Sequence, residues 1–252
     1  MTIGDPTTAR SARAPLSRER VLDVAAGLAD AEGLRAVTMR RVAGELGVEA
    51  MSLYHHVPGK DGLLGGLVDL VVAQVSDAVA ADPAARGDAG GSGDWRVTVR
   101  ARCLAARTVM LRHPWAPELI ASRPTIPPGA FVLFEEVLGV MVRGGCSYWL
   151  AHKALHALGS MVLGFTQELF SPAGGDDGGG PGDAEEDLAA MAEALPYTTA
   201  MVASEMHDAD DPTLGWCDSQ SEFEFTLGLL LDGLARADEP GGLHRPGTAQ
   251  GS

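Results

Sequence analysis

Apolar residues recur with helical spacing along most of this chain, and no stretch alternates apolar and polar residues as a half-buried strand does. This periodicity predicts an all-α fold. The helix predicted over residues 184–206 is interrupted near Pro196. The predicted helices span residues 17–32, 39–46, 50–56, 60–80, 94–112, 115–121, 127–143, 147–170, 184–206 and 218–236.

Segments rich in Gly, Asp and Pro separate these helices. They contain too few apolar residues to form a structure of their own. The predicted organisation is a disordered arm, a small helical head, a larger helical body with two flexible loops at about 82–94 and 171–183, and a disordered tail. The corresponding ranges are 1–15, 16–62, 63–236 and 237–252.

Composition and the absence of targeting signals favour a soluble cytoplasmic protein with no membrane partner. The chain has 252 residues, of which 46% are hydrophobic. The longest apolar run, Leu63 to Val75, contains Asp69 and Gln74 and is shorter than the roughly 18–20 residues that span a bilayer. The first residues lack the apolar stretch of a signal peptide. Three widely spaced cysteines predict neither a disulfide framework nor a zinc cage: Cys103, Cys146 and Cys217.

The net charge of −15 is unevenly distributed. Residues 1–60 carry eight Lys and Arg against seven Asp and Glu, so the remainder carries −16. A nearly neutral head can meet a phosphate backbone locally, while an acidic body is repelled from it. The distribution therefore permits DNA binding through the head and favours one docking orientation.

The segment TMRRVAGELGVEAMSLYHHV (38–57) has the layout of a helix-turn-helix motif. A helix from Met39 to Leu46 is followed by a turn at Gly47 and a second helix beginning near Glu49. Small and hydrogen-bonding side chains on the second helix suit a reader of the major groove. Its exposed face is predicted to carry Ala50, Met51, Ser52, Tyr54, His55 and His56.

Several of these residues have a second interpretation. Tyr54 either contacts DNA or packs between helices, and Arg40 either contacts DNA or only covers an exposed helix face. His55 and His56 are either DNA contacts or solvated surface residues. Arg10 and Arg13 either enter a minor groove or belong to a solvated tail.

The segment LSRERVLDVAAGLADAEGLRAVTMRRVAGELGVEAMSLYHHVPGKDGLL resembles the DNA-binding region of the TetR family of repressors. Residues 113–124, 144–170 and 223–234 resemble the ligand-binding and dimerisation body of the tetracycline-repressor subgroup. The resemblance covers about residues 16–170 and 218–236. It implies an N-terminal three-helix DNA-binding domain followed by a helical ligand-binding and dimerisation domain.

The resemblance also implies roles for single residues of the head. Thr38 matches a position that contacts phosphate, and Arg40 matches one that contacts a base. Ala50, Met51 and Ser52 open the helix that reads base edges, although Ala50 and Met51 differ from the Gln and Pro of the tetracycline repressor, so the operator sequence does not transfer. The remaining phosphate-contacting positions match Tyr54, His56 and Lys60.

Two long apolar helices, 147–170 and 218–236, either fill the core of one chain or, as the resemblance implies, form a four-helix bundle with a second copy. A homodimer places two recognition helices about one DNA turn (~34 Å) apart on a palindrome. The predicted dimerisation residues are Leu155, Leu158, Val162, Phe223, Leu227, Leu230, Leu231 and Leu234.

Aromatic, Met and polar residues of the body are candidates for lining a ligand pocket, although aromatic and Met residues at helical spacing also fill cores. Leu119 stands where the tetracycline repressor has its magnesium-binding His, while Glu168 matches an outer-sphere Glu. We therefore expect a fairly apolar organic effector and no cofactor. The candidates are Trp115, Leu119, Phe131, Phe134, Trp149, His152, His156, Met161, Phe165 and Glu168.

His152 and His156 share a helix face and are spaced to hold a metal ion. No third ligand stands nearby in the sequence, and Lys153 occupies the place of the Glu in HExxH. The sequence-based prediction is therefore no metal site.

Gly62, Gly65 and Gly66 begin the helix that links head and body. They either form a hinge or permit close packing. The resemblance implies that a ligand in the body moves this helix and so changes the spacing of the two heads.

The predicted function is a ligand-responsive transcriptional repressor released from a palindromic operator, although activation remains an alternative. An enzyme is disfavoured because the chain has no G-x-S-x-G, Walker A, GxGxxG or HExxH motif. The other alternative is a helical small-molecule-binding protein whose degenerate head does not read DNA.

Overall fold

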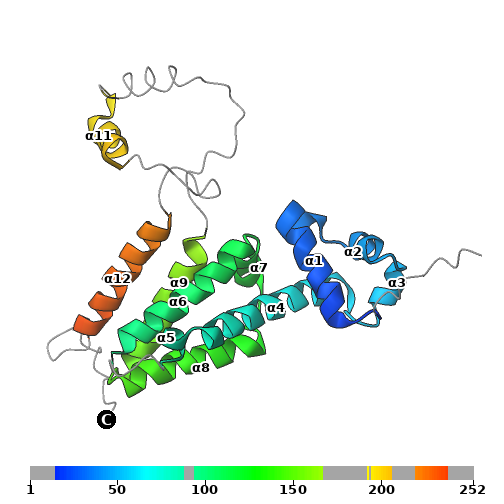
Figure 1. Cartoon of the computed structure of the whole chain (residues 1–252), viewed down its shortest axis with the longest axis horizontal. Helices are drawn as coiled ribbons and strands as arrows, with labels where there is room; N and C mark the ends of the chain where they lie inside the picture. The colour runs from blue at the N-terminus through cyan, green and yellow to red at the C-terminus, as the bar shows by residue number, and fades with distance from the viewer. Residues whose placement is uncertain (1–14, 88–93, 167–191, 193, 206–218, 238–252) are drawn as a thin grey trace, which may run out of the picture.

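The computed structural model describes residues 15–87, 94–166, 192, 194–205 and 219–237, and all regular structure in these residues is helical (Figure 1). The all-α prediction is confirmed. A small head and a larger body are joined by the long helix α4 (Gly59–Ala81).

The head contains α1, a short 3₁₀ helix, α2 and α3. The first two α-helices begin at side chains that satisfy otherwise unpaired amides: the Ser17 hydroxyl accepts from the Arg20 N–H at 3.2 Å, and the Thr38 hydroxyl accepts from the Arg41 N–H at 3.1 Å. The bounds are α1 Arg18–Glu32, η1 Leu34–Ala36, α2 Met39–Leu46 and α3 Ala50–Leu53.

A left-handed glycine makes the tight turn between α2 and α3. Gly47 has φ 67° and ψ 38°, a conformation that carries little penalty for glycine. The recognition helix itself is shorter than the predicted span 50–56, because α3 ends at Leu53 and a turn follows. Residues 54–56 form a turn instead, in which the His56 and Val57 N–H groups both donate to the Leu53 carbonyl at 2.9 Å.

Helix α4 contacts both parts of the molecule. It packs against α1 in the head and against α6, α7 and α8 in the body. Its buried side chains include Leu63, Leu67, Val71 and Val75. Within the part of the chain that the structure describes, α4 alone is long and apolar enough to cross a membrane by length and composition.

The predicted loop at 82–94 contains a short helix, α5 (Pro83–Arg86), which corrects the sequence-based expectation that this segment forms no structure. The Asp82 carboxylate accepts from the Ala84 N–H at 2.8 Å, and Gly87 ends the helix with φ 82°. Ala85 is fully buried, and the short helix α5 that contains it packs against α6.

In the body, α6 packs against α4, α5, α8, α9 and α12, and α11 lies away from the other helices (Figure 1). The predicted helix 147–170 is described only to Thr166 and ends at Gly164. Most of the predicted helix 184–206 lies outside the described residues. The bounds are α6 Trp95–Arg112, α7 Ala116–Ser122, α8 Pro128–Arg143, α9 Tyr148–Gly164, α11 Pro196–Glu205 and α12 Ser219–Ala237.

Candidate nucleic-acid interface and ligand-binding body

The predicted DNA-contacting residues all lie at the surface of the head. Met51 is 70% exposed and Tyr54 is 50% exposed. None of the set is buried: Thr38, Arg40, Ala50, Met51, Ser52, Tyr54, His55, His56 and Lys60.

Two neighbouring arginines on α2 have different surroundings. Arg41 donates to Glu32 Oε1 at 2.8 Å and lies 3.4 Å from Glu45 Oε1. Arg40 has no ion pair with any residue that the structure describes. Both line a shallow hollow of about 390 Å³ together with Thr38 and Glu45. Arg40 is therefore the cation of this pair that is available to an incoming anion.

Thr38 is both a helix cap and a hydrogen-bond donor. Its oxygen accepts the Arg41 N–H, which leaves the hydroxyl hydrogen for a second acceptor. Lys60, at the second residue of α4, is exposed and has no ion pair among the described residues. Both groups can donate to phosphate oxygens.

A buried histidine joins the head to the body. His113, which follows α6, is 5% exposed. Its Nδ1 lies 2.8 Å from Asp30 Oδ1 on α1, and its Nε2 lies 2.9 Å from Gln74 Oε1 on α4. The Trp115 indole N–H donates to the same Asp30 oxygen. One carboxylate of the head is thus held by two side chains of the body.

Trp115 was predicted to line a ligand pocket, and the structure places it at this junction. It borders a hollow of about 500 Å³ whose other walls come from the end of α1, the 3₁₀ helix and α7. Its indole is 7% exposed and hydrogen-bonded to Asp30.

Two ion pairs also cross the junction. Arg18 on α1 lies 3.1 Å from Asp69 on α4, and Arg123 after α7 lies 2.8 Å from Asp61 on α4. The hydrogen bond from the Arg123 guanidinium holds the pKa of the Asp61 carboxyl below its usual value. Because both carboxylates are well exposed, each pair contributes little to stability and serves mainly to fix geometry.

Gly66 allows α4 to approach α1 closely. A methyl group at this position would lie 2.5 Å from Leu22 Cδ2, and Leu22 is itself buried. At Gly65 the nearest atom is Arg123 Nη2 at 3.7 Å, an ordinary contact. The hinge interpretation of these glycines stays a hypothesis, whereas close packing at Gly66 follows directly from this geometry.

Gly66→Ala is expected to lower the free energy of unfolding by about 1–3 kcal/mol, because Leu22 must leave its place in a filled core. Gly65→Ala is the matched control and should be neutral or raise it by up to about 1 kcal/mol, since Ala favours the helix. Urea denaturation of both variants measures the difference. Equal effects would show that the Leu22 contact does not limit this site.

The pocket candidates occupy several separate places in the body. Leu119 is buried, whereas Phe131 is 57% exposed on α8 and packs edge-to-face with Phe134 at 6.1 Å between ring centroids. His152 and His156 lie on the exposed face of α9. Partly buried candidates that pack on the core are Trp149, Met161 and Phe165, and Glu168 lies outside the described residues.

Arg107 is a functional candidate that the sequence analysis missed. It is 1% exposed and sits on α6. Its Nη1 donates to the Phe165 carbonyl at 2.8 Å and its Nε to Gln220 Oε1 at 3.2 Å, while its guanidinium lies 4.6 Å from the Phe223 ring centroid. The spacing of the buried residues Val99, Cys103 and Arg107 places this cation on the inward stripe of α6, and that spacing was the available signal.

Cys103, on the same stripe, is a buried free thiol. Burial raises its pKa to about 12. A thiol that stays protonated at neutral pH is a poor nucleophile, so Cys103 acts as a small apolar core residue.

Six of the eight predicted dimerisation residues lie inside the core of the single chain. Phe223 and Leu227 are fully buried there, and Leu155 and Leu230 are only partly buried. In the single chain these six side chains belong to the core, which is one of the two alternatives that the sequence left open; their part in a dimer stays a prediction. They are Leu158, Val162, Phe223, Leu227, Leu231 and Leu234.

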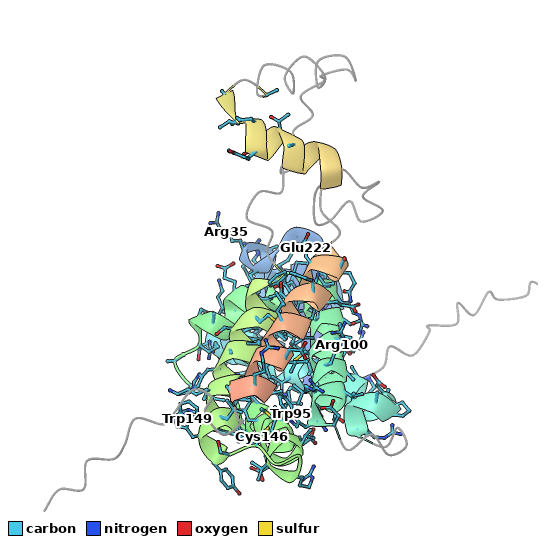
Figure 2. All side chains as sticks on the ribbon, turned by 90° about the vertical axis from the view of Figure 1, so that its left-hand side faces the viewer. Arg35, Trp95, Arg100, Cys146, Trp149 and Glu222 are labelled. Atoms are coloured by element: carbon cyan, nitrogen blue, oxygen red, sulfur yellow. The ribbon has the colours of Figure 1, made fainter. Side chains whose placement is uncertain are left out.

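A second apolar face of α12 remains exposed. Phe225 is 66% exposed and Leu229 is 57% exposed, one helical turn apart. Figure 2 shows α12 and α9 side by side on the face turned to the viewer, with Trp149 at its edge. On α9 the exposed residues near its middle include Gly159 and Ser160, whose small side chains allow another helix to come close.

Comparison with known proteins assigns the two parts of the chain. Residues 21–67 match the model described as "Bacterial regulatory proteins, tetR family". Residues 88–237 match the model described as "Tetracyclin repressor-like, C-terminal domain". Together these matches cover the helix-turn-helix head and most of the body.

Named relatives agree with the family models. The chain is 33% identical over 235 residues to the HTH-type transcriptional repressor DrrR1 of Streptomyces coeruleorubidus, a match that covers 90% of this chain and 82% of the relative. It is 30% identical over 156 residues to the class D tetracycline repressor of Escherichia coli, covering 62% and 67% of the two chains.

The fold is similar to that of the TetR family protein ActR of Streptomyces coelicolor, solved in complex with actinorhodin. The TM-score is 0.64 at 26% identity, with 90% of this chain and 100% of the other covered. The family and these relatives are transcriptional regulators, which excludes the enzyme alternative. The chain belongs to the TetR family of DNA-binding transcriptional regulators.

Proposed function

We propose that this protein is a homodimeric, cytoplasmic repressor that binds a palindromic operator and releases it when a small organic molecule binds its body. The observation that carries the DNA-binding part is the surface of the head. Every residue matched to a DNA-contacting position is at least partly exposed, and the cations Arg40 and Lys60 have no ion pair among the described residues. The repressor DrrR1 supports repression over activation.

Arg40→Ala is expected to weaken operator binding about 10-fold, because a base or phosphate contact of this kind contributes about 1–3 kcal/mol. Arg41→Ala is the matched control, since Arg41 is already held by Glu32 and Glu45. Fluorescence anisotropy with labelled operator DNA measures both. A protein with a degenerate head would show no operator binding in either variant or in the parent chain.

The exposed apolar face of α9 and α12 supports the homodimer. In a two-fold interface the same patch of each copy covers the other, so one apolar patch is enough. Phe225 and Leu229 supply large apolar side chains on α12, and Gly159 with Ser160 lets the α9 helices approach. A dimer built on this face leaves both heads on the outside, where they can meet two half-sites.

Phe225→Asp is expected to weaken dimerisation at least 10-fold, because it places a charge within the proposed interface. The control is Phe131→Asp on α8, where a phenylalanine of similar exposure lies on another helix. Sedimentation velocity over a concentration series gives the dissociation constant of each variant. Loss of dimer only in the Phe131 variant would place the interface on α8 instead.

The effector is proposed to be a largely apolar organic molecule with aromatic character. The body carries aromatic and thioether side chains that are only partly buried, Phe134, Trp149, Met161 and Phe165. One cation, Arg107, is buried next to the last of them and donates to the Phe165 carbonyl. The complex of ActR with actinorhodin shows that one protein of this fold binds this molecule. Actinorhodin is therefore the first probe to test, with release of labelled operator as the readout.

The junction around His113 is proposed to carry the signal from body to head. A ligand shifts the DNA-binding equilibrium only if it binds one arrangement of head and body better than the other. The polar contacts of Asp30 with His113 and Trp115 join α1 to the chain between α6 and α7, so a shift of α6 reaches the head through them.

A further inference from the structure

The exposed face of α9 carries a pair of histidines whose ring nitrogens already face one another. His152 Nε2 and His156 Nε2 are 3.1 Å apart, and the ring centroids are 4.9 Å apart. Both residues are exposed. At most one of the two nitrogens carries a hydrogen in this contact, so at least one lone pair points into the space between the rings.

The separation of these nitrogens fits a transition-metal ion. Imidazole nitrogens bind Zn²⁺ at about 2.0–2.1 Å, so two such ligands in a tetrahedral arrangement are ~3.4 Å apart, and ~2.9 Å apart at a right angle. The observed 3.1 Å lies between these values. Rotation of the two rings until both lone pairs point to one position would let both nitrogens bind one ion.

One chain supplies only part of the coordination shell. Within the described residues, no group of three or more His, Cys, Asp or Glu side chains is placed to hold a metal ion. The neighbouring charged residue on this face is Lys153, which cannot serve as a ligand while protonated. The remaining ligands must therefore come from outside these described residues, such as water or another molecule.

We propose that His152 and His156 form half of a site for a divalent first-row transition ion such as Zn²⁺, and that the same pair of a second copy completes it. The proposal rests on the proposed homodimer. The midpoint of α9 is residue 156, and the exposed face of this helix belongs to the proposed interface. Where a helix crosses its symmetry-related copy, residues at the crossing meet their own counterparts, which brings four imidazoles around one point. Four nitrogen ligands satisfy tetrahedral Zn²⁺.

The test is titration of the full-length, metal-stripped protein with Zn²⁺ by calorimetry, together with sedimentation velocity with and without Zn²⁺. We expect one ion per two chains and a dimer dissociation constant at least 10-fold lower with saturating Zn²⁺. His152→Gln with His156→Gln should abolish both effects. A variant combining Lys153→His with His156→Gln keeps the number of histidines but loses the spacing of four residues, and it should also fail.

Zinc binding that is equal in the parent chain and in the double variant would overturn the site. One ion per chain with unchanged dimerisation would overturn the sharing between two copies. Failure of the proposed function is a separate outcome, tested by measuring dimerisation and operator binding in EDTA. A metal-stripped protein that neither dimerises nor binds a palindrome contradicts the repressor proposal itself. Operator binding that persists in EDTA leaves the repressor proposal standing whatever the zinc titration shows.

Discussion

Arg107→Ala is expected to lower the free energy of unfolding by about 3 kcal/mol or more. The guanidinium connects α6 to the end of α9 and to α12 through the Phe165 carbonyl, Gln220 and the ring of Phe223. Truncation leaves these acceptors unpaired inside the protein and opens a cavity, and each change alone costs about 1–3 kcal/mol. Urea denaturation followed by circular dichroism measures the loss.

Arg112→Ala on the same helix is the control, because this arginine is exposed and should change stability by less than about 0.5 kcal/mol. Arg107→Met separates packing from hydrogen bonding, because Met fills most of the volume but leaves the acceptors unpaired. Its loss of unfolding free energy should therefore lie between the losses of Arg107→Ala and Arg112→Ala. An Arg107→Ala variant as stable as the control would mean that Arg107 does not organise the contact of α12 with the body.

His113→Leu is expected to lower the free energy of unfolding by about 2–3 kcal/mol and to weaken the response of operator binding to effector. The substitution removes two buried hydrogen bonds, one of them to the Asp30 carboxylate, and hydrogen bonds to charged groups contribute about 1.5–3 kcal/mol. Because Asp30 is one-third exposed, water recovers part of the loss. Denaturation gives the stability, and effector-dependent release of labelled operator gives the coupling.

A double-mutant cycle of Asp30→Asn and His113→Gln isolates the interaction between these two residues. We expect a coupling energy of about 1 kcal/mol or more, with effector affinity unchanged in each single variant. Additive effects would show that head and body are held together by the apolar packing of α4 alone, and the proposed path of the signal would then be wrong.

Local sequence signals predicted the head well. The predicted helix 39–46 agrees with α2, because the residues next to its two ends, Thr38 and Gly47, determine where it begins and ends. The predicted helix 17–32 likewise agrees with α1, which begins directly after its capping residue, Ser17. Recognition helix α3 was predicted too long, because residues 54–56 form a turn that the local sequence pattern does not distinguish from helix.

Periodicity could not distinguish the two apolar faces of α12. The stripe through Phe223 and Leu227 is continuous in the sequence and was assigned to the dimer, yet it faces the chain's own core. Phe225 and Leu229 form a shorter, second stripe on the opposite side. Which face a second copy would cover depends on how α12 docks on α6 and α9, and that docking is not encoded in spacing.

The junction was invisible to sequence reasoning for a similar reason. Asp30 and His113 are 83 residues apart, so no local pattern connects them. Trp115 was noted as a pocket residue because it is aromatic, whereas its indole N–H donates to the carboxylate of the head. Long-range polar contacts of this kind appear only once the helices are placed in space.

Selection of bound sequences from a random DNA pool, followed by binding to the enriched site at several salt concentrations, tests the central claim most directly. The account predicts a palindrome with half-sites about one DNA turn apart and an affinity that falls steeply with salt, as several phosphate contacts require. Absence of any enriched sequence across the salt range would contradict it, and would leave a helical ligand-binding protein whose head no longer reads DNA.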